Sequence, residues 1–174
     1  MKTYTKTLNI IVPCYNEEES IPLFYKETRK QEAFFHEKDV EFEFVFVNDG
    51  SKDGTVAAVK KLHEQDERVH LISFSRNFGK EAAIIAGLEK STGDFTVLMD
   101  ADLQDDPCEL RAFSEKLDEG YDLVSGWKYN RLDPLEKRLP SKLFNRVTRK
   151  MSGVNLHDFN CGFKAYRRDV VKTI

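Results

Sequence analysis

The chain has 174 residues, a mass of 20.2 kDa and a formal net charge of −3. Its hydrophobic content of 40%, with 13 phenylalanines, excludes a disordered chain and suits one globular domain with a substantial core. No apolar run approaches the roughly 18 residues of a membrane span, and the polar N-terminus lacks a signal-peptide core, so we expect a cytoplasmic chain.

Five short apolar runs, rich in β-branched and aromatic residues, predict β-strands at 8–12, 42–47, 69–74, 95–99 and 123–126. Helices are expected between them, at 20–35, from 55 onward, at 79–90 and at 107–120. Ser20 is a candidate cap for the first of these helices. Strands that alternate with helices in this way predict βαβ units and a parallel sheet covered on both faces.

Polar and acidic segments follow three of the predicted strands, at 13–17, 48–51 and 100–102. In a parallel sheet these segments meet at the carboxyl edge, where ligands bind. The first strand is not followed by a glycine-rich dinucleotide turn, and no P-loop sequence occurs. The sequence therefore predicts a site built from acids, which needs a metal ion to accept a phosphate group.

Asp100 and Asp102 lie one residue apart at the end of the fourth strand, and Gln104 follows them. Hard oxygen ligands in this position suit Mg²⁺ or Mn²⁺, which commonly take one or two carboxylates together with substrate phosphates. The alternative is a polar loop that caps a helix. Cys14 also lies near this edge, where a small buried side chain is a better interpretation than a nucleophile.

Five segments, at 11–18, 47–55, 75–81, 99–107 and 158–167, resemble glycosyltransferase family 2. The third and the last of them are similar to the branch that transfers sugars to polyprenyl phosphates, which includes dolichol-phosphate mannose synthase and the bactoprenol glucosyltransferases. The resemblance implies a GT-A fold, an α/β Rossmann-like arrangement with a mixed, mostly parallel sheet and helices on both faces. It also implies that residues 1–174 form one catalytic domain, ending before the C-terminal membrane-associated segments that relatives carry.

The same resemblance assigns residues to the nucleotide sugar, which they would bind through its base, ribose and diphosphate. Asp49 would accept from the base, although it could instead cap the following helix, and Lys80 would meet a phosphate unless it is simply solvated. Asp100, Asp102 and Gln104 would hold the metal and diphosphate, and Asp102, Asp158 and Arg131 would take part in catalysis. The full donor set is Pro13, Tyr15, Glu17, Asp49, Lys80, Asp100, Asp102 and Gln104.

Residues 127–150 carry eight basic side chains and two acidic ones, whereas the rest of the chain is acidic. This asymmetry indicates an anion-binding surface. The resemblance implies that the phosphate of the acceptor binds Arg131, Lys137, Arg138 and Ser141. It leaves open which of Lys137 and Arg138 contacts that phosphate. Asp158 could orient the acceptor or the sugar, act as a base as in relatives with hydroxyl acceptors, or be a turn residue.

A helix is expected from Pro140, with Leu143, Val147 and Met151 on an apolar stripe flanked by basic residues. Such a helix can lie on an anionic membrane surface or face a core. With a lipid acceptor expected, the enzyme would act at the inner face of the cell membrane, where related chains are anchored.

The resemblance thus implies a metal-dependent, inverting glycosyltransferase that moves a hexose from a nucleotide sugar to polyprenyl phosphate. UDP-glucose or UDP-N-acetylglucosamine is favoured over GDP-mannose, with Mg²⁺ or Mn²⁺ as cofactor, a homo-oligomer as an open possibility and no nucleic-acid partner. Two alternatives remain: transfer to a saccharide hydroxyl in polysaccharide synthesis, and a nucleotide-sugar-binding module without turnover.

Overall fold

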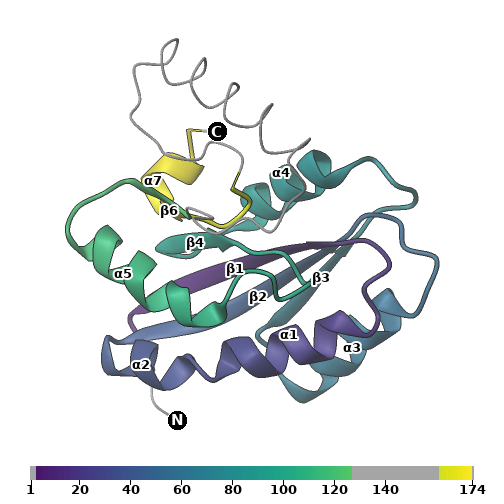
Figure 1. Cartoon of the computed structure of the whole chain (residues 1–174), viewed down its shortest axis with the longest axis horizontal. Coiled ribbons are helices and arrows are strands. Elements are labelled where there is room, and N and C mark those ends of the chain that lie inside the picture. Colours follow the sequence, from purple (N-terminus) through teal and green to yellow (C-terminus); the bar gives the residue numbers. More distant parts are fainter. Residues whose placement is uncertain (1–2, 127–160, 174) are drawn as a thin grey trace, which may run out of the picture.

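A computed structural model describes residues 3–126 and 161–173 (Figure 1). The strands are β1 (Lys6–Cys14), β2 (Val40–Asn48), β3 (Val69–Ser73), β4 (Phe95–Leu98), β5 (Leu123–Ser125) and β6 (Lys164–Arg167). The helices are α1 (Ser20–Arg29), α2 (Glu32–Glu37), α3 (Thr55–Gln65), α4 (Lys80–Lys90), the 3₁₀ turn η1 (Pro107–Glu109), α5 (Leu110–Asp118) and α7 (Arg168–Val171).

The six strands form one sheet in the order β3-β2-β1-β4-β6-β5. β1 to β4 are parallel, as predicted, but β6 runs antiparallel to both β4 and β5. All five predicted strands are confirmed, and so is the mixed, mostly parallel fold class. β6 was not predicted, because its four residues include a Lys and an Arg and show no apolar run.

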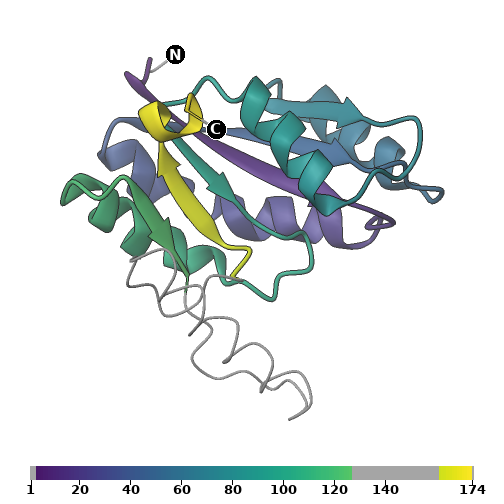
Figure 2. The ribbon, with the colours of Figure 1, turned by 90° about the horizontal axis from the view of Figure 1, so that it is seen from above.

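Helices cover both faces of the sheet, as predicted (Figures 1 and 2). α1, α2, α3 and α5 pack on one face over a core rich in phenylalanine, whereas α4 and α7 pack on the other. On the first face the rings of Phe24 and Phe46 meet edge to face, with centroids 6.2 Å apart. Because alternate residues of a strand point to opposite faces, Ile10 belongs to the first core and Ile11 to the second.

Two helix predictions are corrected. The single helix expected at 20–35 is divided into α1 and α2, since the backbone N–H groups of Lys30 and Gln31 turn back to the carbonyls of Glu27 and Thr28. Ser20 is the first residue of α1, and no side chain caps that helix. Every helix within 3–126 and 161–173 is too short or too polar to span a bilayer.

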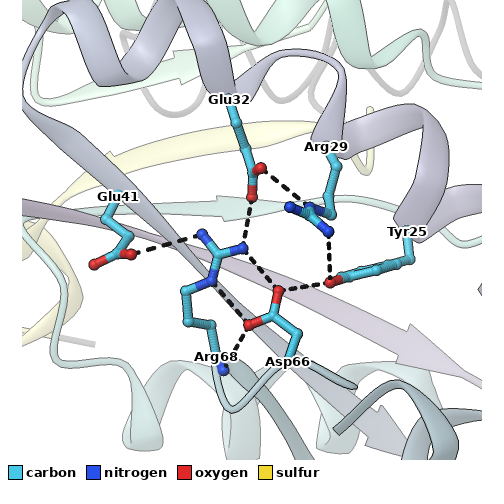
Figure 3. Close-up of polar contacts among 6 residues, drawn as sticks. All are labelled: Tyr25, Arg29, Glu32, Glu41, Asp66 and Arg68. Carbon is cyan, nitrogen blue, oxygen red and sulfur yellow. Dashed lines mark hydrogen bonds and ion pairs between the residues drawn. The ribbon is translucent and has the colours of Figure 1, made fainter. Parts of the chain in front are cut away.

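A network of charged side chains ties the amino-terminal ends of β2 and β3 to α1 and α2, away from the carboxyl edge of the sheet (Figure 3). Arg68 is its centre, with ion pairs to Glu32 at 3.0 Å and to Asp66 at 2.7 Å. Burial raises the pKa of Tyr25 to about 12, and the hydrogen bond that its hydroxyl donates to Asp66, at 2.6 Å, adds to this. These contacts hold the start of β3 against α1 and α2.

Replacing Asp66 by Asn tests the network. Burial alone would raise the pKa of the Asp66 carboxyl, but hydrogen bonds from Arg68 and Tyr25 outweigh it and hold the pKa below its usual value. Because the folded state has the lower pKa, the carboxylate stabilises the fold at neutral pH, and this contribution is lost as the pH falls below 3.8. We expect Asp66→Asn to reduce the free energy of unfolding by about 2 kcal/mol at pH 7.

Urea unfolding at neutral and acidic pH measures both effects. Asp118→Asn is the matched control, because Asp118 makes an exposed ion pair with Lys38, and such pairs contribute about 0–1 kcal/mol. The difference in the free energy of unfolding between the wild type and Asp66→Asn should become smaller as the pH falls below 3.8. If Asp66→Asn loses no more stability than Asp118→Asn, or if its loss of stability does not depend on pH, the contacts of the Asp66 carboxylate do not stabilise the fold as proposed.

Candidate active-site cleft

A cleft of about 390 Å³ lies at the carboxyl ends of the parallel strands. The segments that follow β1, β2 and β4 all contribute to it, as does the start of α4. Its lining residues are Pro13, Cys14, Tyr15, Glu17, Asp49, Asn77, Gly79, Lys80, Ala83, Asp100, Ala101 and Asp102.

Seven of the eight residues expected to bind the donor line this cleft. The exception is Gln104, which is exposed and whose backbone N–H donates to Asp102 Oδ1 at 3.0 Å. The remaining candidates lie outside the described residues, and so does the helix expected from Pro140. These candidates are Arg131, Lys137, Arg138, Ser141 and Asp158.

Two of the loops at the cleft are joined by hydrogen bonds between the segment after β1 and the segment after β2. The N–H of Asn16 donates to Ser51 Oγ at 2.9 Å, and the N–H of Lys52 donates to Asn16 Oδ1 at 2.9 Å. The N–H of Glu17 donates to Thr55 Oγ1 at 2.8 Å. These bonds fix the backbone that carries Tyr15 and Glu17 relative to β2.

Asp49 holds a third loop in place. It is buried, and its two carboxylate oxygens accept from the backbone N–H groups of Phe78 at 2.7 Å and Gly79 at 2.9 Å. The alternative in which Asp49 caps α3 is wrong, because Asp53 accepts from the N–H of Thr55 there. Asp49 therefore positions the residues directly before Lys80, and only its remaining lone pairs are available to a ligand.

Lys80 and Asp100 form an ion pair within the cleft. Lys80 Nζ lies 2.6 Å from Asp100 Oδ1 and 2.7 Å from Oδ2. The side chains are 48% and 30% exposed, so the pair is open to solvent. Lys80 is the first residue of α4 and Asp100 follows β4, so this contact joins two elements of the sheet edge.

Asp102 is exposed at the mouth of the cleft, two residues beyond Asp100. Within the described ranges, no group of three or more His, Cys, Asp or Glu side chains could hold a metal by itself. Two carboxylates on one cleft nonetheless fit Mg²⁺ or Mn²⁺, which take their other ligands from substrate phosphates and water. The residues present are compatible with a metal that binds together with a diphosphate.

Cys14 does not have the properties of a nucleophile. Burial raises the pKa of its thiol to about 12, and the negative charges of Glu17, Asp53 and Asp49 add to this. The thiol therefore stays protonated at neutral pH, and the reactive thiolate does not form. The structure agrees with the interpretation of Cys14 as a small buried side chain.

The sequence did not single out Asn77, Gly79 or Ala83 as residues of the site. The first two lie in the motif at 75–81, so the motif itself was the signal for them. Gly162 was also missed: a Cβ atom there would lie 3.4 Å from Asp100 Oδ2 and 3.7 Å from Lys80 Nζ. The segment before β6 thus comes into contact distance of the Lys80–Asp100 pair.

Comparison with known proteins shows the family of the chain. The family described as "Glycosyl transferase family 2" matches residues 9–174. The chain belongs to glycosyltransferase family 2. Among curated members of the family, the undecaprenyl-phosphate 4-deoxy-4-formamido-L-arabinose transferase of Pseudomonas paraeruginosa is 38% identical over 176 residues, covering 100% of this chain and 51% of that protein. The protein of the same name from Photorhabdus laumondii is 35% identical over 97% of this chain and 51% of its own length.

The chain spans about half the length of these family 2 relatives.

Solved structures establish the GT-A fold. A mannosyltransferase from Pyrobaculum calidifontis, in complex with GDP-Man and Mn²⁺, has a TM-score of 0.69 at 24% identity, over 98% of this chain and 47% of that one. Glucosyl-3-phosphoglycerate synthase from Mycobacterium tuberculosis, in complex with Mn²⁺, UDP and phosphoglyceric acid, has a TM-score of 0.66 at 19% identity. The match covers 95% of this chain and 57% of that one.

Proposed function

We propose that this chain is the catalytic domain of a metal-dependent, inverting glycosyltransferase that transfers a sugar from a nucleotide sugar to polyprenyl phosphate. The observation that carries the proposal is the cleft itself, in which Asp49, Lys80, Asp100 and Asp102 come together from three separate segments of a family 2 chain. Seven of the expected donor-binding residues share that cleft.

Each part of the cleft suits one part of the donor. Tyr15 is 44% exposed and offers an aromatic face for the base. Pro13, Glu17 and Asp49 complete the base and ribose end. Asp100 and Asp102 in the cleft, with Gln104 from outside its lining, would hold a divalent ion, and that ion would offset the negative charge that develops on the leaving oxygen of the diphosphate. The ammonium of Lys80 at the start of α4 supplies a positive charge for the diphosphate.

The acceptor in this proposal is a lipid phosphate rather than a sugar hydroxyl. A phosphate oxygen needs no general base, because a second pKa of about 6 leaves the phosphate mostly dianionic at neutral pH. It attacks the anomeric carbon, a new carbon–oxygen bond forms, and the bond to the nucleoside diphosphate breaks with inversion. The name of the relatives supports this acceptor, since it contains undecaprenyl phosphate. Such a reaction would take place at the inner surface of the cell membrane.

The acceptor phosphate is proposed to bind Arg131, with Lys137, Arg138 and Ser141, while Asp158 orients the acceptor or the sugar. Arg131→Ala should lower kcat/KM for the lipid about 10²-fold, because a charged contact to the reacting phosphate is lost. The affinity for the nucleoside diphosphate, measured by calorimetry, should change by less than about twofold. Equal losses in acceptor use and nucleotide binding would mean that Arg131 is structural.

The proposal also names candidates for the sugar that is transferred. The motif at 75–81 favours UDP-glucose or UDP-N-acetylglucosamine, whereas the name of the relatives adds 4-deoxy-4-formamido-L-arabinose as a candidate. A donor screen tests the function: the purified protein is incubated with Mn²⁺, polyprenyl phosphate and each UDP- or GDP-sugar in turn. We expect one donor to release nucleoside diphosphate only when the lipid is present. Binding of a nucleotide sugar without release, with every acceptor tried, would indicate a binding module instead.

A further inference from the structure

The Lys80–Asp100 pair has a consequence for metal binding that follows from its geometry. Lys80 Nζ lies within 2.7 Å of both carboxylate oxygens of Asp100. A metal ion that uses Asp100 as a ligand needs a lone pair of at least one of these same two oxygens, and the positive charge of the ammonium beside them repels it. A lysine ammonium and a divalent cation therefore compete for one carboxylate.

The charges around the pair explain why the lysine lies there. The cleft is lined by four carboxylates, from Glu17, Asp49, Asp100 and Asp102. Among the described residues that line it, Lys80 is the only basic one. An excess of negative charge in a concave site attracts the nearest cation and repels a diphosphate.

We propose that Lys80 competes with the divalent ion for Asp100 and is transferred to the diphosphate when metal and nucleotide bind together. This inference rests on the proposed function, which places a metal at Asp100. One lysine then has two opposite effects. It weakens metal binding when nucleotide is absent, and it strengthens nucleotide binding when metal is present. Binding of the two ligands is coupled through Lys80, and such coupling is reciprocal.

The surroundings of the pair allow this exchange. Both side chains are partly exposed, and ion pairs of this kind contribute little stability, so the contact can break readily. Gly162 places no side chain beside the pair, although a Cβ atom there would touch both partners. Asp49 fixes the backbone of Phe78 and Gly79, so the exchange needs movement of the Lys80 side chain only.

Calorimetric titration with Mn²⁺, first without nucleotide and then with saturating UDP or GDP, tests the proposal. Lys80→Gln should bind Mn²⁺ alone about tenfold more tightly than the wild type, and should bind the nucleotide in the presence of Mn²⁺ about tenfold more weakly. Lys90→Gln is the matched control, since Lys90 is the exposed last residue of the same helix and the same charge is removed. It should leave both affinities unchanged.

The outcomes separate this inference from the proposed function. If the wild type binds Mn²⁺ with nucleotide but Lys80→Gln gains no affinity for Mn²⁺ alone, the competition is refuted and the metal site stands. If the wild type binds no Mn²⁺ even with nucleotide, both ideas fail. Lys80→Met, which removes the charge and all hydrogen bonding, should reproduce the opposite shifts, and a loss of both affinities in the two variants would overturn the proposal.

Discussion

Asp102→Asn should abolish metal-dependent nucleotide binding while leaving the fold intact. Asp102 is exposed at the cleft mouth, and its hydrogen bond to the N–H of Gln104 can be kept by an amide oxygen. Asn keeps an oxygen ligand but removes the negative charge that Asp102 would contribute to a divalent ion. We therefore expect the affinity for UDP or GDP with Mn²⁺ to fall by about tenfold or more and kcat to fall by about 10²-fold or more.

Calorimetry with and without EDTA measures the binding, and urea unfolding checks the fold. Asp118→Asn removes the same charge from the exposed face of α5, outside the cleft, and should leave nucleotide binding unaltered. If Asp102→Asn binds nucleotide with Mn²⁺ as well as this control does, Asp102 is not a metal ligand.

Gly50→Ala should cost more stability than substitutions of the other glycines within 3–126 and 161–173, and it should also weaken nucleotide binding. Gly50 has φ +69, and a Cβ atom there would lie 2.3 Å from the backbone carbon of Arg76 and 2.6 Å from the backbone nitrogen of Asn77. The backbone strain and the forced displacement together should lower the free energy of unfolding by about 3 kcal/mol. The displaced loop at residues 76–77 leads directly to Lys80, so the affinity for the nucleotide should fall as well.

Gly120→Ala separates strain from contact. Gly120 has φ +103, but nothing lies within 4 Å of a Cβ atom there, so only the backbone strain remains, at about 1 kcal/mol. Urea unfolding and Mn²⁺-dependent nucleotide affinity should be measured for both variants. Equal losses of stability would show that the close approach of Gly50 to the 76–77 backbone is unimportant.

The parallel part of the fold could be predicted because each strand is a short apolar run that ends at polar residues. The same pattern placed Asp49, Asp100 and Asp102 at one edge before any contact was known. β6 could not be found in this way, because its burial comes from pairing with β4 and β5 and not from its own composition. The break between α1 and α2 was hidden as well, since residues 30 and 31 carry no proline or glycine.

The contacts within the site depend on long-range geometry, which a single sequence does not reveal. Asp49 was expected to serve the base or cap α3, yet its oxygens bond the backbone 29 and 30 residues further along the chain. The Lys80–Asp100 pair likewise joins residues 20 positions apart. These contacts bring residues of separate motifs together in one cleft, and they explain why a substitution at Gly50 should act on Lys80.

The chemical identity of the product tests the proposed transfer to a lipid phosphate. The purified protein is incubated with polyprenyl phosphate, Mn²⁺ and the sugar-labelled donor that the screen selects, and the lipid fraction is then treated with mild acid. We expect label to enter the lipid, to be released as free sugar by the acid, and to be absent when EDTA replaces Mn²⁺ or when Asp102→Asn replaces the wild type. Label found only in saccharide products that resist mild acid would contradict the proposed transfer to a lipid phosphate.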